Sequence, residues 1–147
     1  MEAVILSGVQ GAGKSTFCRE RFWNSHVRLN LDRLRTRHRE RLLLEALIEA
    51  KQPFVVDNTN PTPEARSRYL LPAKAAGFRI VGFQFEVPLE VAVARDAARP
   101  AQERLPEQAV RGIFGKMVPL SYTEGFDRIH IVGPLESLDF EIWEVLP

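Results

Sequence analysis

The stretch Gly8-Val9-Gln10-Gly11-Ala12-Gly13-Lys14-Ser15 decides the fold of this chain of 147 residues. It follows an apolar run over residues 3–6 and precedes a segment with helical character, which is the context that a phosphate-binding P-loop requires. Glycines let successive backbone N–H groups curl around a phosphate, and a helix opening at Gly13 adds its positive dipole end. A glycine-rich turn that matches by chance is the alternative, and the flanking strand and helix disfavour it.

The residues of this loop have expected parts in binding ATP and Mg²⁺. Lys14 reaches the β- and γ-phosphates, Ser15 is a ligand of Mg²⁺, and Thr16 supplies a hydroxyl near the α-phosphate. The predicted ATP-binding residues of the loop are Gly8, Gln10, Gly11, Ala12, Gly13, Lys14, Ser15 and Thr16.

Length, charge and cysteine content narrow the class of protein. The length suits a single domain over residues 1–147. The net charge is +1, but residues 101–147 hold eight acidic and four basic side chains, so the positive excess lies with the P-loop. The lone Cys18 excludes an internal disulfide and is expected to be a small buried hydrophobe. With no signal peptide and no apolar run of about 18 residues, we expect a cytoplasmic protein without membrane contact.

Apolar runs alternate with amphipathic segments of helical length, which predicts an α/β protein of the P-loop kinase type. We expect a parallel sheet of five strands flanked by helices, with a lid like that of adenylate kinase. The expected strands lie near residues 2–7, 26–30, 53–57, 78–85 and 128–132, and the helices near 14–23, 32–50, 62–76, 88–99 and 106–117. The partly alternating tail over residues 138–146 is compatible with an additional edge strand.

Acidic and amide residues follow the second and third expected strands. Asp32 comes after the second strand, and Asp57-Asn58-Thr59-Asn60 comes after the third. Ligands of open α/β sheets bind at the carboxyl ends of the strands, so these residues are expected to share a crevice with the P-loop. Asp32 is suited to act as a general base on an acceptor hydroxyl, or to cap the helix that follows it. The residue chemistry leaves both readings open.

Arg35 and Asp57 each admit a functional and a structural interpretation. Arg35, three residues after Asp32 on the expected helix, could grip a phosphate of the acceptor, or be one solvated arginine within the run over residues 33–41. Asp57 ends an apolar strand and could support the Mg²⁺ shell. It could equally form an Asx turn with its asparagine neighbours before Pro61.

Arg95 and Arg99 lie four residues apart, on one face of an expected helix. A polar, proline-bounded stretch, residues 99–106, follows and has the character of a lid. Arginines on such a lid neutralise charge on a transferring phosphoryl group. The alternative is a surface helix in which Arg99 pairs with Glu103.

These residues together resemble the kinase domain of polynucleotide kinases, the 5′-hydroxyl kinases of phage and bacterial end-healing enzymes and of the animal kinase–phosphatase. The matching landmarks are residues 8–16, Asn30-Leu31-Asp32 with Arg35, residues 54–61, Arg66-Ser67-Arg68-Tyr69, Arg95 with Arg99, and Thr123-Glu124-Gly125-Phe126. The family usually has Arg where this chain has Leu31.

The resemblance implies a role for each matching position. Lys14, Asp32 and Arg99 would be the catalytic residues, with Asp32 activating the 5′-hydroxyl and Arg99 contacting the transferred phosphate. Arg35 would hold the 3′-phosphate of the terminal nucleotide, with Asn58 also on the acceptor side. Arg95 would line the ATP side of the lid, and Ser15 would bind Mg²⁺ with Asp57 in support.

The sequence therefore favours ATP-dependent phosphoryl transfer to the 5′-hydroxyl end of DNA or RNA. Because the net charge is close to zero, we expect a short contact with one strand end rather than a long groove. A kinase of a small-molecule hydroxyl, on a nucleoside, sugar or antibiotic, remains the first alternative. An ATP-binding switch without transfer is the second, although the chain has no Asn-Lys-x-Asp segment. The oligomeric state and the choice of DNA or RNA stay open.

Overall fold

The computed structural model describes residues 1–134 and 140–147 and is built on one six-stranded sheet, in the order β2-β3-β1-β4-β5-β6. The strands are β1 (Glu2–Ser7), β2 (Val27–Leu29), β3 (Phe54–Val56), β4 (Arg79–Phe85), β5 (Arg128–Pro134) and β6 (Phe140–Val145). The first five are parallel, as predicted, whereas β6 runs antiparallel to β5. The edge strand expected over residues 138–146 is thus β6, and residues 138 and 139 lie outside the described residues.

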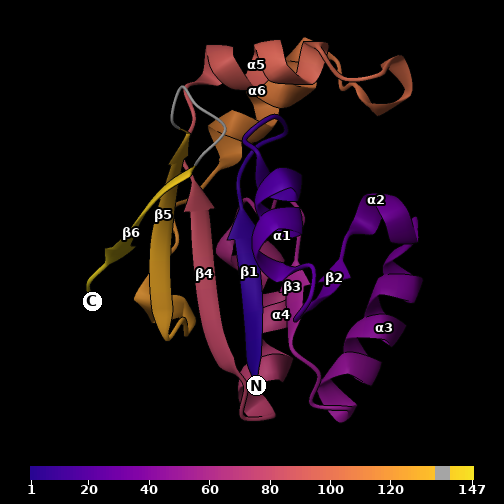
Figure 1. The fold of residues 1–147 in the computed structure, drawn as a ribbon, viewed down its shortest axis with the longest axis vertical. Coiled ribbons are helices and arrows are strands. Elements are labelled where there is room, and N and C mark those ends of the chain that lie inside the picture. Colours follow the sequence, from indigo (N-terminus) through magenta and orange to yellow (C-terminus); the bar gives the residue numbers. More distant parts are fainter. Residues whose placement is uncertain (135–139) are drawn as a thin grey trace.

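Helices cover both faces of the sheet and the carboxyl ends of its strands (Figure 1). They are α1 (Lys14–Phe22), α2 (Leu31–Leu34), α3 (Arg37–Glu49), α4 (Pro63–Ala75), α5 (Leu89–Ala97) and α6 (Glu107–Lys116), with short 3₁₀ turns η1 (Ala101–Glu103) and η2 (Tyr122–Glu124). In Figure 1, α5 and α6 lie across the end of the molecule toward which the parallel strands point. Among the described residues, no helix is long and apolar enough to cross a membrane.

Alternate side chains of β1 enter two separate cores, because successive residues of a strand point to opposite faces. Val4 and Leu6 pack with Phe17 of α1, whereas Ala3 and Ile5 pack with Tyr69 and other residues on the α4 side. All four strand residues are completely buried. A strand buried on both faces reads as a continuous apolar run, which is why β1 stands out in the sequence.

The single helix expected over residues 32–50 is wrong, because the chain breaks it into α2 and α3. Asn30 accepts a hydrogen bond from the backbone N–H of Arg33, and Thr36 accepts one from that of Arg39, so each helix has its own N-cap. Between them, Arg35 ends α2 with φ of 76°, a conformation that a helix interior does not allow. Two capping side chains close together therefore override the helical pattern.

A buried arginine joins α4 to the segment that follows α6. Arg66 is completely buried, and its Nε and Nη2 donate to the two carboxylate oxygens of Glu124 at 2.8 and 2.9 Å. Its Nη1 donates to the carbonyls of Asn60 and Val118 at 2.9 and 3.1 Å. A planar guanidinium can satisfy all these acceptors in one plane. These landmark residues thus hold the loop after β3 against residues 118–119.

Candidate active site

The P-loop lies between β1 and α1 and is packed against α5. Gly11 and Gly13 have φ of 82° and 95°, which favour glycine. A Cβ atom on Gly11 would lie 2.5 Å from the carbonyl oxygen of Ala92 in α5. The glycine at this position is therefore required both by its backbone conformation and by the close approach of α5.

Lys14 is buried within the loop, and its Nζ donates to the carbonyl oxygens of Gly8 and Val9 at 2.7 and 2.9 Å. Burial lowers the pKa of Lys14 to about 8, and the charge of Arg99 lowers it further, while Asp57 and Asp32 act in the opposite direction. Charges from α2, the end of β3 and the segment after α5 thus act on the ammonium group at the start of α1. The convergence of segments predicted from the strand order is confirmed.

The hydroxyl and carboxylate expected near Mg²⁺ are in contact. Ser15 Oγ donates to Asp57 Oδ2 at 3.1 Å, and the Asp57 side chain is almost fully buried. Hydroxyl and carboxylate oxygens are ligands that Mg²⁺ accepts, with water and phosphate oxygens completing its octahedron. No group of three or more His, Cys, Asp or Glu side chains that could hold a metal occurs in the described part of the chain. The residues present fit a metal that is held largely by nucleotide phosphates.

Arg28 on β2 also belongs to this cluster, and the sequence analysis missed it. Its Nη2 and Nε lie 2.6 and 2.8 Å from Asp57 Oδ2, and its Nη2 donates to Ser15 Oγ at 3.3 Å. Two positive side chains, Lys14 and Arg28, therefore flank the buried carboxylate. A charged residue in the middle of a short strand, beside the strand that delivers Asp57, was the available signal.

Asp32 lies in the first turn of α2 with an exposed side chain. The proposal that it caps this helix is wrong, because Asn30 is the N-cap. Within the described ranges the Asp32 carboxylate makes no hydrogen bond or ion pair, yet its charge acts on Lys14. The exposed carboxylate is therefore accessible to a ligand.

The position of α2 is set by hydrogen bonds to the residues that follow β3. Asn30 Nδ2 donates to the carbonyl of Asp57 at 2.6 Å, and Asn58 Oδ1 accepts the backbone N–H of Leu31 at 2.9 Å. Asn58 Nδ2 donates to buried Glu40 at 3.1 Å and to the Tyr69 hydroxyl at 3.0 Å. Asn58, predicted to bind the acceptor, thus has internal partners for its whole amide and positions the helix that carries Asp32.

Arg35 does not share a helical face with Asp32, because α2 ends before it. Its side chain is exposed and has no hydrogen-bond or ion-pair partner in residues 1–134 and 140–147. It remains a free cation at the end of α2. The positive φ of 76° turns the chain there and explains why the helical spacing to Asp32 fails.

The predicted lid arginines both contact the P-loop. Arg95 Nη1 lies 3.4 Å from the carbonyl of Gly11, and Arg99 Nη1 donates to Gln10 Oε1 at 3.1 Å. Arg99 also lies 4.0 Å from Glu103, so the surface pair considered as the alternative exists beside the P-loop contact. Buried Asp96 accepts the backbone N–H of Leu105 at 2.9 Å and folds the lid loop back onto α5.

Cys18 is buried in α1 against the sheet, as expected. Burial raises the pKa of its thiol to about 11, and the nearby Asp57 carboxylate raises it further. A thiol that stays protonated is a poor nucleophile. Cys18 therefore contributes packing rather than chemistry.

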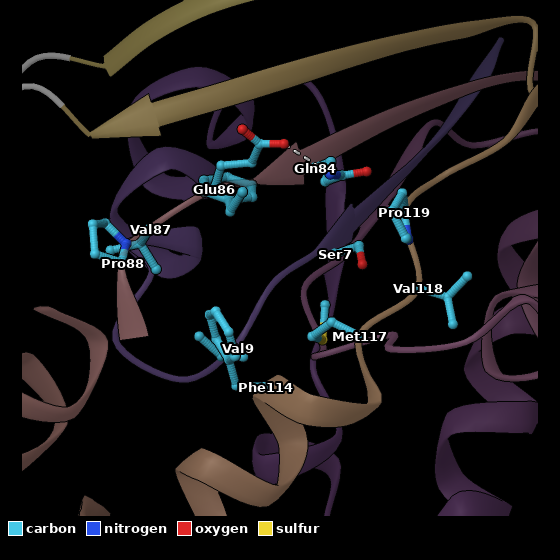
Figure 2. Close-up of a pocket in the computed structure, with 11 residues that line it drawn as sticks. Ser7, Val9, Gln84, Glu86, Val87, Pro88, Phe114, Met117, Val118 and Pro119 are labelled. Atoms are coloured by element: carbon cyan, nitrogen blue, oxygen red, sulfur yellow. Dashed lines mark hydrogen bonds between the residues drawn. The ribbon is translucent and has the colours of Figure 1, made fainter. Parts of the chain in front are cut away.

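A pocket of about 390 Å³ adjoins the P-loop at the carboxyl ends of β1 and β4 (Figure 2). Apolar side chains dominate its lining, together with three polar residues. The lining residues are Ser7, Val9, Gln84, Phe85, Glu86, Val87, Pro88, Phe114, Met117, Val118 and Pro119. The sequence analysis did not predict this pocket, since its walls come from three separate segments.

Comparisons with known proteins agree with this geometry. The bifunctional polynucleotide phosphatase/kinase of Schizosaccharomyces pombe is 30% identical over 148 residues, covering 95% of this chain and 35% of that protein. The predicted resemblance to polynucleotide kinases is thereby confirmed, although the chain spans only about a third of that relative's length.

Solved structures show the same fold. Chaetomium thermophilum Kti12 in complex with ADP-AlF3 superimposes with a TM-score of 0.67 at 14% identity, over 89% of this chain and 88% of that one. A gluconokinase from Sinorhizobium meliloti 1021 gives 0.59 at 18% identity, over 90% and 82%. The predicted P-loop kinase fold is confirmed.

A family profile described as an AAA domain matches residues 4–119. The chain therefore belongs to the AAA domain family AAA_33 and has the α/β fold of P-loop kinases.

Proposed function

We propose that this domain transfers the γ-phosphate of ATP to the 5′-hydroxyl end of a DNA or RNA strand. The observation that carries the proposal is the open Asp32 carboxylate, which has no internal partner among the described residues and acts electrostatically on the P-loop Lys14. A carboxylate beside a bound triphosphate is suited to accept the proton of an attacking hydroxyl. An ATP-binding switch would have no need of this group.

The chemical work is then divided among named side chains. In this proposal the P-loop amides and Lys14 bind the β- and γ-phosphates. Arg95 and Arg99, which contact Gly11 and Gln10 of the P-loop, act on the same phosphates from the lid. Asp32 takes the proton while the hydroxyl oxygen attacks in line and the β–γ bridging oxygen leaves with ADP. Preorganised charge lowers the barrier because these groups need no reorganisation during transfer.

Mg²⁺ would be held by Ser15 with Asp57 in support, and when bound it would neutralise charge on the β- and γ-phosphates. Arg28 neutralises the buried Asp57 carboxylate. Because one guanidinium already balances that charge, we infer that Mg²⁺ arrives mainly with the nucleotide.

The choice of a nucleic-acid acceptor rests on similarity and on charge. The 30% identical relative carries polynucleotide kinase in its name. Arg33 and Arg35, at the end of the helix that carries Asp32, have exposed side chains with no partner in the described residues. Arginine side chains without partners near the general base Asp32 favour an anionic acceptor, such as a strand end, over a neutral sugar. We propose that Arg35 contacts a phosphate of the terminal nucleotide and that Asn58 positions α2 instead of touching the acceptor.

The test is transfer of labelled γ-phosphate from ATP to matched 5′-hydroxyl and 5′-phosphate oligonucleotides of DNA and RNA. We expect label only on the 5′-hydroxyl ends, with the DNA to RNA ratio giving the sugar preference. Titration calorimetry with ATP is run in parallel. Bound ATP without labelled oligonucleotide would favour the second candidate, a small-molecule acceptor, whose hydroxyl would use the same Asp32.

A further inference from the structure

The pocket between the P-loop, the end of β4 and the end of α6 has no part in the phosphate chemistry described so far. Resting on the proposed function, we propose that it receives the nucleobase of the acceptor's terminal nucleotide. Its volume of about 390 Å³ is within the range of small-ligand sites and exceeds the size of a single base.

The walls of the pocket suit a flat aromatic ligand. Phe114 and Val118 are 39% and 42% exposed, so both apolar side chains are accessible to a ligand in the pocket. Phe114 lies near Val9 of the P-loop at one end of the pocket, with Met117 close by (Figure 2). An accessible phenyl ring beside apolar walls is a stacking surface for a base.

The opposite end of the pocket presents a hydrogen-bond acceptor. Gln84 Oε1 accepts the backbone N–H of Leu120 at 2.8 Å, and its Nε2 donates to Glu86 Oε1 at 3.2 Å (Figure 2). In the described part of the chain the other Glu86 oxygen makes no hydrogen bond. A carboxylate accepts from amino groups, so Glu86 favours adenine, cytosine and guanine over thymine and uracil.

The pocket lies at the boundary between the two cores. Val9, Phe85 and Val87 belong to the core on the α1 side, whereas Ser7 and Gln84 lie on the same strand faces as Ile5 and Ile80 of the α4 core. Ser7 Oγ donates to the carbonyl of Asn60 at 2.9 Å. The pocket floor is thus bonded to the loop after β3.

The loop after β3 also leads to Asp32, the proposed general base. The backbone N–H of Val118 donates to the carbonyl of Pro61 at 2.7 Å, which joins the far wall of the pocket to the loop as well. Within the loop, Asn58 holds the first residue of α2, next to Asp32. A strand whose 5′-hydroxyl reaches Asp32 would therefore have its first nucleobase near this pocket.

The experiment compares Phe114→Ala with Trp23→Ala, which removes another exposed aromatic ring, 73% exposed at the end of α1. For each variant, KM is measured separately for a 5′-hydroxyl oligonucleotide and for ATP. We expect Phe114→Ala to raise the KM for the oligonucleotide about tenfold or more, because base stacking on an aromatic ring has an effect of this size. The KM for ATP should not change, and Trp23→Ala should leave both values unchanged.

Oligonucleotides with adenine, cytosine, guanine, thymine or no base at the 5′ position provide the second arm. Loss of the nucleobase should raise the KM of the wild-type enzyme for the oligonucleotide about as much as Phe114→Ala does. In the Phe114→Ala variant, loss of the nucleobase should raise this KM little further. Glu86→Gln should reduce the preference for amino-bearing bases over thymine. Phe114→Leu keeps aliphatic packing and should still lose the stacking effect if Phe114→Ala does not fold.

Two results would overturn the inference. If the wild type phosphorylates the abasic strand as well as its parent, the pocket does not hold the acceptor base. If Phe114→Ala raises the KM for ATP instead, the pocket holds the base of the donor. If no oligonucleotide is phosphorylated, the proposed function fails. Oligonucleotide binding, measured by fluorescence anisotropy, then tests the pocket separately. Weaker oligonucleotide binding by Phe114→Ala supports a base site, and equal or absent binding rejects it.

Discussion

The ATP side and the acceptor side of the candidate site are built in different ways. On the ATP side, polar groups of the P-loop are bonded to one another before any ligand binds, as Lys14 is to Gly8 and Val9. On the acceptor side, Asp32 and Arg35 are left without partners in the described residues, and only the helix beneath them is held. The ATP side is thus an internally hydrogen-bonded loop with a buried charge, and the acceptor side presents unpaired charged groups on a helix that is held by hydrogen bonds.

The largest effect should come from the centre of the ATP side. Lys14→Met removes the positive charge that faces the β- and γ-phosphates, and we expect ATP binding and every ATP-dependent activity to be lost. Titration calorimetry with ATP and the γ-phosphate transfer assay measure the two losses. Lys51→Met, which changes an exposed lysine after α3, serves as the matched control. Retained ATP affinity in Lys14→Met would show that Lys14 does not face the phosphates.

On the acceptor side, Asp32→Asn should separate binding from transfer. The amide cannot accept the proton, so we expect kcat to fall by roughly 10² to 10⁴ while ATP affinity is unchanged. Exposed Glu20 of α1, changed to Gln, controls for loss of one surface carboxylate. Near-normal transfer by Asp32→Asn would remove the general base from the proposal.

The buried ammonium of Lys14 gives the ATP side a pH dependence. Because the pKa of folded Lys14 is about 8, we expect ATP affinity to fall by up to about tenfold per pH unit above pH 8. Between this pKa and the ordinary value of 10.5, the unfolded chain binds the additional proton, so this group makes stability rise with pH by up to about 1.4 kcal/mol per unit.

Calorimetry and urea unfolding at pH 7 to 10.5 measure these opposite trends. In Lys14→Met, the rise in stability over this range should disappear. Equal slopes in the wild type and this variant would mean that another group is responsible for the pH dependence.

The fold should depend on Arg28 to balance the buried charge of Asp57. Arg28→Met leaves a buried carboxylate with one positive neighbour fewer, and the loss of a partly exposed partner should lower the free energy of unfolding by about 1–3 kcal/mol. Urea unfolding in EDTA measures this loss. In the double variant Arg28→Met/Asp57→Asn the charge is gone, so much of the stability should return. A double variant as unstable as the single one would show that Arg28 acts through packing alone.

The smallest expected effect tests how the acceptor side is held. Asn58→Ala removes the acceptor for the Leu31 N–H and the donor to Glu40 and Tyr69. We expect kcat to fall about tenfold, because Asp32 loses its alignment while the P-loop is untouched. ATP affinity is the control measurement. A rise in the KM for the oligonucleotide at unchanged kcat would instead support direct acceptor binding by Asn58.

Local patterns accounted for most of the fold. The five parallel strands lie where apolar runs end in turn or phosphate-binding residues, and α4, with Thr62 as its N-cap, lies where the helix over residues 62–76 was expected. The break between α2 and α3 could not be predicted from the sequence, because Asn30 and Thr36 act as caps only when their neighbours are already placed. For the site, motif spacing predicted Lys14, Ser15, Asp32, Asp57, Arg95 and Arg99, and the structure brings them to one end of the sheet.

The sequence by itself determined the P-loop, the order of strands and helices and the chemical types that meet at the sheet edge. These depend on residues close together in the chain and on the rule that parallel strands end at one edge. Only the tertiary structure decided that Arg28 shares Asp57 with Ser15, that Asn58 supports α2 rather than standing free, and that three distant segments enclose the pocket beside Val9. Such contacts join residues far apart in sequence, and packing, not local propensity, selects which of the available polar groups pair and which stay open to a ligand.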